Sequence, residues 1–217
     1  MLRRALIGAF AVAIAASAGG ASLGQPKMAG PSTDPAAAPA GEYALDPLHA
    51  SVVARIKHLG LSNFAIRFDT LEASYSFDPA HPTASKVTAR VDANSFDVGN
   101  QRYQDMALNE HFIKQRDILG MSKNPNVTFV STSIRSTGGN RGTMSGDLTL
   151  NGVTKPVTFD VVFNGTAPGM GGGPQRMGFS AVTTLHRSDF QIAAMMPPPI
   201  LSDEVTLQIE AEFTKKS

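Results

Sequence analysis

The 217-residue sequence contains no cysteine. Disulfide bonds are therefore excluded, and so is a lipid anchor attached to a cysteine. A chain without disulfides must gain its stability from a hydrophobic core. The roughly 170 residues that follow the N-terminal segments are enough for one such domain.

The sequence also lacks an apolar run long enough to cross a membrane as a helix, which needs about 20 residues. The run from Ala5 to Ala16 follows two arginines and precedes several small residues. This pattern predicts a secretory signal peptide over residues 1–21, with cleavage after Ala18 or Ala21. A membrane anchor is the alternative interpretation, for which the run is short.

Neither sign of charge is in excess. The chain has 19 Lys and Arg against 18 Asp and Glu, and removal of the predicted signal peptide leaves 17 basic residues. A nucleic-acid-binding face needs concentrated positive charge, which the sequence does not show. We therefore predict no nucleic-acid partner and no stable membrane span after cleavage.

Residues 22–41 are rich in proline, alanine and glycine and show no apolar periodicity. This composition predicts a flexible tether between the signal peptide and the domain. The predicted organisation is a signal peptide at 1–21, a tether at 22–41 and one domain at 42–217.

Most apolar runs after Gly41 alternate with period two, which is typical of strands buried on one face. The clearest run is 205–213, with an apolar residue at every odd position. About eight or nine such runs, separated by turn signals, indicate an all-β fold. We predict an antiparallel eight-stranded barrel, because closure removes the sheet edges. A two-sheet sandwich is the alternative.

Two stretches depart from this alternation. In the run 64–77 the apolar positions change parity near Asp69–Thr70, which predicts a bulge or a sharp bend. Residues 100–113 instead hold spaced apolar residues among polar ones. They predict one short amphipathic helix outside the strand pattern, with Asn100 as its N-cap.

Residues 146–163 predict a hairpin around an Asn-Gly turn, in which Leu150 faces either Val153 or Lys155. Both registers put Lys155 on the inward phase and Pro156 at a non-hydrogen-bonded pair. Because proline has no N–H to donate, the strand on the other side of Pro156 is not expected to pair with it at this position. The Lys-Pro pair therefore predicts a rim of the barrel.

Four segments occur in an order and spacing typical of one family. They are YALDPLHASVVARIKHLG, NPNVTFVSTSI, GDLTLNGVTKPVTFDVVF and FSAVTTLHRSDFQI. Together they resemble the YceI-like family of polyisoprenoid-binding proteins from about Tyr43 to Lys216. The resemblance implies a lipocalin-like barrel in the bacterial periplasm that holds an isoprenoid chain in an apolar channel. It supplies no catalytic motif.

The inward-facing phase of the strands is the expected ligand surface. Small residues interrupt the large ones on it, which fits either a solid core or an open apolar channel. Composition alone does not decide between the two. The expected channel lining is Val52, Ala54, Ile56, Val87, Ala89, Val91, Leu148, Phe159, Val161, Phe163, Phe179, Ala181, Leu185, Leu207 and Ile209.

Three basic residues, His58, Lys155 and Arg187, lie on the inward phase near strand ends. A ring of cations at a mouth would hold a pyrophosphate or polarise a quinone carbonyl. Alternatively, each extends at the rim with its stem on apolar surface. Met195 and Met196, in the apolar segment MMPPPI, are expected either to form a lid or to pack as a hairpin tip.

The five histidines show no close spacing of metal ligands, so we predict no metal site. No nucleophile or acid–base pair is evident on the inward phase, so we predict no catalytic residue and no cofactor. The sequence thus predicts a periplasmic carrier of a long-chain isoprenoid, such as a polyprenyl quinone or a polyprenyl phosphate. The alternatives are a small cell-envelope enzyme acting on a lipid-like substrate and an interaction module with a filled core.

Overall fold

The computed structural model describes residues 30–114 and 124–217. The predicted signal peptide lies outside the described residues, as do tether residues 22–29. The strands are β1 (Gly41–His58), β2 (Ser62–Phe68), β3 (Leu71–Phe77), β4 (Lys86–Asp92), β5 (Phe96–Asp97), β6 (Arg102–Tyr103), β7 (Met106–Ala107), β8 (Asn126–Gly138), β9 (Arg141–Leu150), β10 (Val153–Ala167), β11 (Arg176–His186) and β12 (Leu201–Lys215). The helical elements are α1 (Leu108–Lys114) and the short 3-10 helices η1 (Pro35–Ala37), η2 (Pro82–Ala84), η3 (Ala93–Ser95), η4 (Met170–Gly172) and η5 (Arg187–Phe190).

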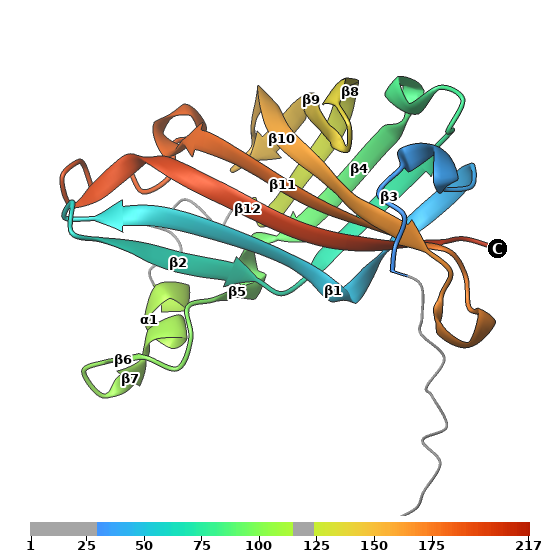
Figure 1. Cartoon of the computed structure of the whole chain (residues 1–217). Helices are drawn as coiled ribbons and strands as arrows, with labels where there is room; N and C mark the ends of the chain where they lie inside the picture. The colour runs from blue at the N-terminus through green and yellow to red at the C-terminus, as the bar shows by residue number, and fades with distance from the viewer. Residues whose placement is uncertain (1–29, 115–123) are drawn as a thin grey trace, which may run out of the picture.

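Eight strands close into an antiparallel barrel (Figure 1). Their order around the wall is β1, β3, β4, β8, β9, β10, β11 and β12, and β12 pairs with β1 to complete the ring. The continuous ladder confirms the predicted barrel and excludes the two-sheet sandwich. Closure explains the one-face alternation, because every strand turns one side inward.

The first strand has two partners along one edge. Its start, Gly41–Ala44, pairs with β3, and its end, Val52–His58, pairs with β2. Strands β2 and β3 run in the same direction and are separated only by Asp69 and Thr70. This break is the predicted bend. It lets β2 and its neighbour β5 flare away from the main wall (Figure 1).

The β9–β10 hairpin adopts the shorter of the two predicted registers, with Leu150 facing Val153. Both turn residues, Asn151 and Gly152, have positive φ (52° and 77°), as a type I′ turn requires. Pro156 pairs with Asp147, whereas the ladder from β10 to β11 starts only at Asp160. The missing proline N–H therefore costs no ladder bond, as the sequence predicted.

The helix is shorter than the sequence predicted. Residues 102–107 form a small hairpin of β6 and β7, with Gln104 at φ 55° in its turn, and α1 begins only at Leu108. The backbone N–H of Leu108 donates to the carbonyl of Gln101, which closes this hairpin. Local strand pairing thus replaces the first half of the predicted helix.

One end of the barrel is closed by a packed cluster of buried side chains. Tyr43 and Met177 are fully buried there. The chain before β1 contributes to this plug, since Ala38 is 1% exposed and Ser32 bridges to Thr166. Within residues 30–41, expected to be part of a flexible tether, Ala38 is therefore buried in this cluster and Ser32 pairs with β10, whereas most of the other residues are exposed. The whole cluster is Ala38, Tyr43, Tyr75, Phe77, Phe163, Met177 and Phe213.

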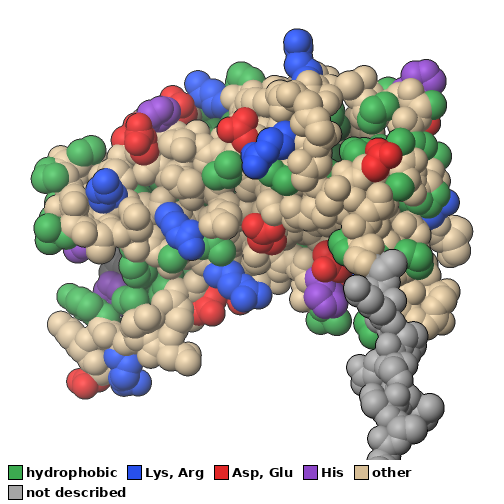
Figure 2. Space-filling view, viewed as in Figure 1, with side chains coloured by type: hydrophobic (Ala, Val, Ile, Leu, Met, Phe, Trp, Pro, Cys, Tyr) green, Lys and Arg blue, Asp and Glu red, His purple; other side chains and the backbone are tan. Residues whose placement is uncertain are grey.

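Acidic and basic side chains are interspersed over the face shown in Figure 2. This distribution agrees with the balanced charge of the sequence. Within the described residues, no helix has the length and apolar character that a membrane-crossing helix needs.

Candidate functional site: an apolar cavity inside the barrel

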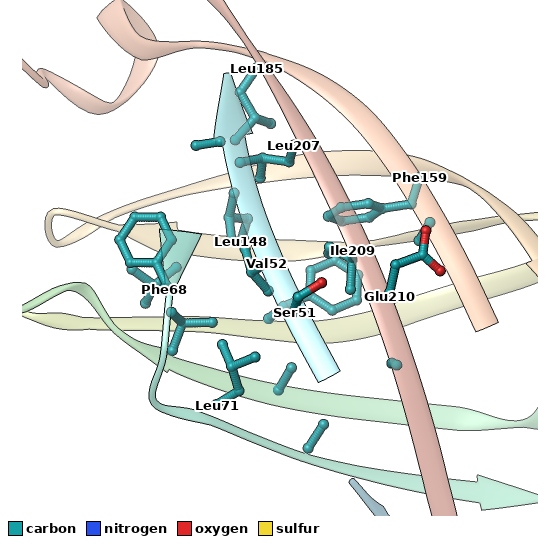
Figure 3. A pocket seen from close by; sticks show the side chains of 18 of the residues that line it. Ser51, Val52, Phe68, Leu71, Leu148, Phe159, Leu185, Leu207, Ile209 and Glu210 are labelled. Atoms are coloured by element: carbon teal, nitrogen blue, oxygen red, sulfur yellow. The ribbon is translucent and has the colours of Figure 1, made fainter. Parts of the chain in front are cut away.

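A cavity of about 990 Å³ lies inside the barrel. All fifteen residues of the predicted channel lining are on its wall. Figure 3 shows Phe68 and Leu71 on one side of this space and Phe159 and Ile209 on another. The interior is therefore hollow, and the solid-core interpretation does not fit it. That these residues contact a ligand stays a prediction.

Part of the wall beside the cavity is densely packed. Side chains of β8 to β11 form a dense cluster in which Phe129 and Phe159 meet edge to face, with ring centroids 5.3 Å apart. Ala54 and Ile56 of β1 are also buried but belong to neither dense cluster. The cluster members are Phe129, Leu148, Val157, Phe159, Leu185 and Phe190.

Alanines provide much of the room. Ala73 and Ala89 are direct partners on β3 and β4, and both line the cavity. Ala54 and Ala181 line it from β1 and β11. A methyl group in place of a larger side chain leaves volume that the neighbouring residues do not fill.

One wall of the cavity lies outside the lining predicted from the sequence. Phe64, Ile66 and Phe68 of β2 line it, and Phe112 of α1 packs on Phe64 with ring centroids 5.7 Å apart. The alternation of apolar and polar residues in β2 indicates that Phe64, Ile66 and Phe68 share one face of the strand. The placement of Phe112 follows from the chain path after η3, which no local pattern reveals.

Exposed residues occur at two places on the lining. Near the β1–β2 turn it includes the exposed residues His58 and Tyr103, and we call this opening the mouth. Between η2 and the β8–β9 turn it includes the exposed residues Thr83, Ser136 and Gly139.

The three basic residues predicted at a mouth are not equivalent. His58 is exposed and lies on the cavity lining beside the mouth. Lys155 is exposed and is not part of the lining, because β10 carries it beyond the enclosed space before Val157 turns inward. The geometry therefore gives no support to Lys155 as a headgroup ligand.

Arg187 is buried, at 6% exposure, and its hydrogen-bonding capacity is already used. Its guanidinium has five N–H donors. They meet five backbone carbonyls, at distances of 2.5 to 3.2 Å, and no donor is left for a ligand headgroup. The acceptors are the carbonyl oxygens of Ile192, Ala193, Met196, Leu201 and Ser202.

The two methionines of the predicted lid point to different surroundings. Met196 is half-buried and lines the cavity, whereas Met195 is 78% exposed and does not. Only Met196 is thus placed to cover the interior. Met195 belongs to the outer surface of the same loop.

Polar groups are few on the cavity wall. Tyr75 and Arg187 are buried ionisable residues of this wall, and burial raises the pKa of the Tyr75 phenol to about 12. It therefore stays neutral at physiological pH and is a poor general base. This environment favours the burial of apolar ligands.

One cluster of side chains outside the cavity resembles a set of metal ligands. Asp46, His49 and Glu212 lie together where β1 bulges. However, the Nη1 atom of Arg176 is 2.8 Å from Asp46 and 3.1 Å from Glu212, so a cation already sits between the carboxylates. The His49 hydrogen bond lowers the pKa of Asp46. The cluster is an ion-pair network that fastens β1 to β11 and β12.

Comparison with known proteins agrees with this architecture. A UPF0312 protein of Pseudomonas putida is 38% identical over 179 residues, covering 82% of this chain and 88% of the relative. A YCEI protein of Campylobacter jejuni superposes with a TM-score of 0.62 at 31% identity, over 74% of this chain and 90% of that one.

Two further solved structures share the fold at lower identity. BcnA of Burkholderia cenocepacia has a TM-score of 0.66 at 24% identity, over 77% of this chain and 98% of its own. A polyisoprenoid-binding domain from Saccharophagus degradans has a TM-score of 0.59 at 15% identity, over 80% and 98%. The YceI-like domain model matches residues 43–213, nearly the whole described barrel. The chain therefore belongs to the YceI-like domain family.

Proposed function

We propose that this protein is a periplasmic carrier that holds a long-chain isoprenoid lipid inside its barrel. The observation that carries the proposal is the cavity of about 990 Å³ with its almost wholly apolar wall. Its size is at the upper end of the range of about 300–1,000 Å³ for small-molecule sites. Family membership and the polyisoprenoid-binding neighbour from Saccharophagus degradans support the class of ligand.

Binding energy would come from apolar burial. Each buried methylene contributes about 0.8 kcal/mol, so a chain of several isoprene units gains enough to offset its loss of freedom. The fifteen inward-facing residues predicted from the sequence would supply most of this contact surface, together with the β2 wall. A chain longer than the cavity would extend to the surface at the mouth.

The cavity constrains the headgroup. A polyprenyl quinone is uncharged and would be buried whole. A polyprenyl phosphate would have to keep its charge at the surface, because the buried cation Arg187 has no free donor. Arg135 and Arg141 are exposed residues of the lining near the β8–β9 turn, and a phosphate at the surface would lie beside such cations.

We expect binding without catalysis. On the described cavity wall, the buried Tyr75 phenol stays neutral and the donors of the buried Arg187 are bonded to backbone carbonyls, while the carboxylate Asp46 lies outside the cavity in an ion-pair network. An enzyme acting on a lipid would need an activated nucleophile or an acid–base pair next to the chain. The filled-core module is disfavoured by the cavity itself.

Extraction of the purified protein with organic solvent, followed by mass spectrometry, tests the proposal. The expected result is one isoprenoid lipid per protein, present reproducibly after purification from a periplasmic extract. The identified headgroup would distinguish a quinone from a phosphate. A protein that is purified empty and takes up neither a polyprenyl quinone nor a polyprenyl phosphate would overturn the proposal.

A further inference from the structure

Exposed apolar side chains gather at the mouth end of the barrel. Leu59, Leu61, Met195 and Ile200 are 48%, 85%, 78% and 44% exposed, and they make up four of the nine large apolar side chains that are exposed among the described residues. The backbone N–H of Leu59 donates to the carbonyl of Ile200 at 3.0 Å, so the two loops lie side by side. Figure 2 shows apolar side chains at this end. Such concentrations mark interaction sites.

The loop before β12 is unusual in composition. None of the ten residues 192–201 has a polar side chain. Ala194, Met195 and all three prolines of this loop are exposed. An exposed apolar run of this length disfavours solubility unless it has a binding role. We call residues 59–61 and 192–201 together the apolar tip.

The apolar tip is held rigidly. The five hydrogen bonds from Arg187 end on backbone carbonyls of residues 192–202, so one buried side chain fixes the path of the whole loop. Phe190 is 2% exposed and anchors the start of the loop in the barrel, where its carbonyl accepts from Asn151. A fixed loop presents Met195 and Ile200 outward without an ordering cost on binding.

Positive charge borders the apolar tip on one side. Between Asp46 and Asp69 the sequence has no acidic residue. Arg55 and Lys57 on β1 are exposed, and neither forms an ion pair within the described part of the chain. Arg67, further from the tip, pairs with Asp69. Unpaired cations beside an apolar surface match an anionic lipid surface.

Acidic residues also lie near the apolar tip, and Asp203 and Glu204 are on β12, the strand that pairs with β1. Asp203 accepts hydrogen bonds from the backbone and hydroxyl of Ser188 and is therefore engaged within the protein. Asp189 and Glu204 are exposed. An approach with the β1–β2 hairpin toward an anionic surface would bring the exposed Arg55 and Lys57 close to it.

The apolar surface continues from the tip into the interior. Met196, Ile200 and Leu201 belong to the apolar tip and also line the cavity, next to His58 at the mouth. Resting on the proposed function, we propose that the apolar tip docks the mouth on the surface of an anionic membrane, so that an isoprenoid passes between bilayer and cavity along apolar surface. A bilayer fits this surface better than a protein partner does, because the cargo itself resides in bilayers.

Sedimentation with lipid vesicles tests this proposal. The protein is expressed from the full-length chain, its N-terminus is established by intact-mass measurement, and it is mixed with vesicles of phosphatidylethanolamine and phosphatidylglycerol or of phosphatidylcholine alone. We expect stronger binding to the anionic vesicles and weaker binding at high salt, since screening weakens exposed charge interactions. Absence of binding to either kind of vesicle would overturn the proposal.

Matched variants make the test specific. The double substitution Leu61→Gln with Met195→Gln should lower partitioning about tenfold or more, because two apolar side chains no longer enter the lipid. The control is Leu48→Gln with Met170→Gln, whose side chains are equally exposed, at 87% and 85%, but lie outside the tip. It should bind as the wild type does, and equal loss in both variants would overturn the proposal.

An introduced tryptophan reports insertion directly, because the chain has none of its own. The fluorescence of Leu61→Trp should shift to the blue when anionic vesicles are added, whereas that of Leu48→Trp should not. Sedimentation velocity without lipid tests the other possible occupant of the tip, which is a second copy of the chain. If the tip variant loses self-association and the wild type ignores vesicles, the tip is an interface between copies and the proposal fails.

Lipid analysis of the same samples separates this proposal from the proposed function. Because the tip residues Leu61 and Met195 do not line the cavity, the tip variant should keep its isoprenoid content. Tip-dependent vesicle binding by a protein without isoprenoid would contradict the carrier function alone. A stoichiometric isoprenoid in a protein that ignores vesicles would contradict docking alone.

Discussion

Gly146 of β9 lies directly against the ring of Phe129 of β8. A Cβ atom built on Gly146 would be 2.6 Å from Phe129 Cε2, and the Val130 carbonyl would also block it. The ring thus occupies the space that a side chain at Gly146 would need. It packs there edge to face on Phe159, at the densest part of the cavity wall.

We predict that Gly146→Ala destabilises the fold by about 1–3 kcal/mol, because the backbone carbonyl cannot move away and the ring must. Gly178→Ala is the matched control in β11, since its new Cβ would meet Asn164 at an ordinary 3.5 Å. Denaturant unfolding should show little change for the control. Equal stability of the two variants would contradict the steric argument.

Narrowing the cavity should remove its ligand without unfolding the barrel. Ala181→Phe adds a ring on the cavity side of β11, whereas Val182→Phe adds the same ring at a neighbouring position that does not line the cavity and is 42% exposed. We expect about tenfold less co-purified lipid in the first variant and no change in the second. Since the ring enters empty space, the first variant should lose less than about 2 kcal/mol of unfolding free energy. Undiminished lipid content would mean that the ligand lies elsewhere.

Arg187→Met should act on stability and not on headgroup preference. The substitution leaves five backbone carbonyls without their donor, at an expected cost of about 3 kcal/mol or more. Arg187→Lys, with three donors, should recover part of this loss. The affinity ratio between a polyprenyl pyrophosphate and the matching alcohol should be the same in all three proteins. A ratio that changes only in the Met variant would restore a direct role for Arg187 at the headgroup.

Tyr75 should make the protein sensitive to alkali. Burial raises the pKa of the folded phenol to about 12, above the ordinary value of 10.0. The folded state thus holds its proton more tightly than the unfolded state, so the resulting stability is complete below pH 10 and is lost as the pH rises through 12. Two pH units correspond to about 2–3 kcal/mol.

The comparison with Tyr75→Phe isolates this contribution. Between pH 10 and 12 the wild type should lose more unfolding free energy than the variant, and absorbance titration of tyrosinate should show a component near pH 12 that the variant lacks. Identical pH profiles for the two proteins would show that Tyr75 is solvated.

Most of the fold prediction rested on the alternation of apolar and polar residues along the strands. A barrel strand needs an inward and an outward side, so residues such as Val52, Phe159 and Leu207 could be assigned to the interior from parity alone. The bend at Asp69–Thr70 was visible because it reverses that parity. The register of the β9–β10 hairpin could not be predicted from the sequence, because both possible registers place the same side chains inward.

Other features depend on contacts between distant segments. The role of Arg187 could not be read from its inward parity, because its partners come from the following loop and from β12. The burial of Ala38 required the closed end of the barrel, and a Pro-, Ala- and Gly-rich segment gives no local sign of it. The empty volume is itself a property of packing, and composition is the same for a full and a hollow barrel.

The plug that seals one end of the barrel also determines where the chain leaves it. The described chain starts at this end with residues 30–40, and the C-terminus emerges at the same end, opposite the apolar tip (Figure 1). An affinity handle or a fluorescent protein fused after Ser217 would therefore leave the mouth unobstructed. Immobilised by that handle, every molecule would present the same pole to the solution, which makes the protein suited to oriented sensor surfaces.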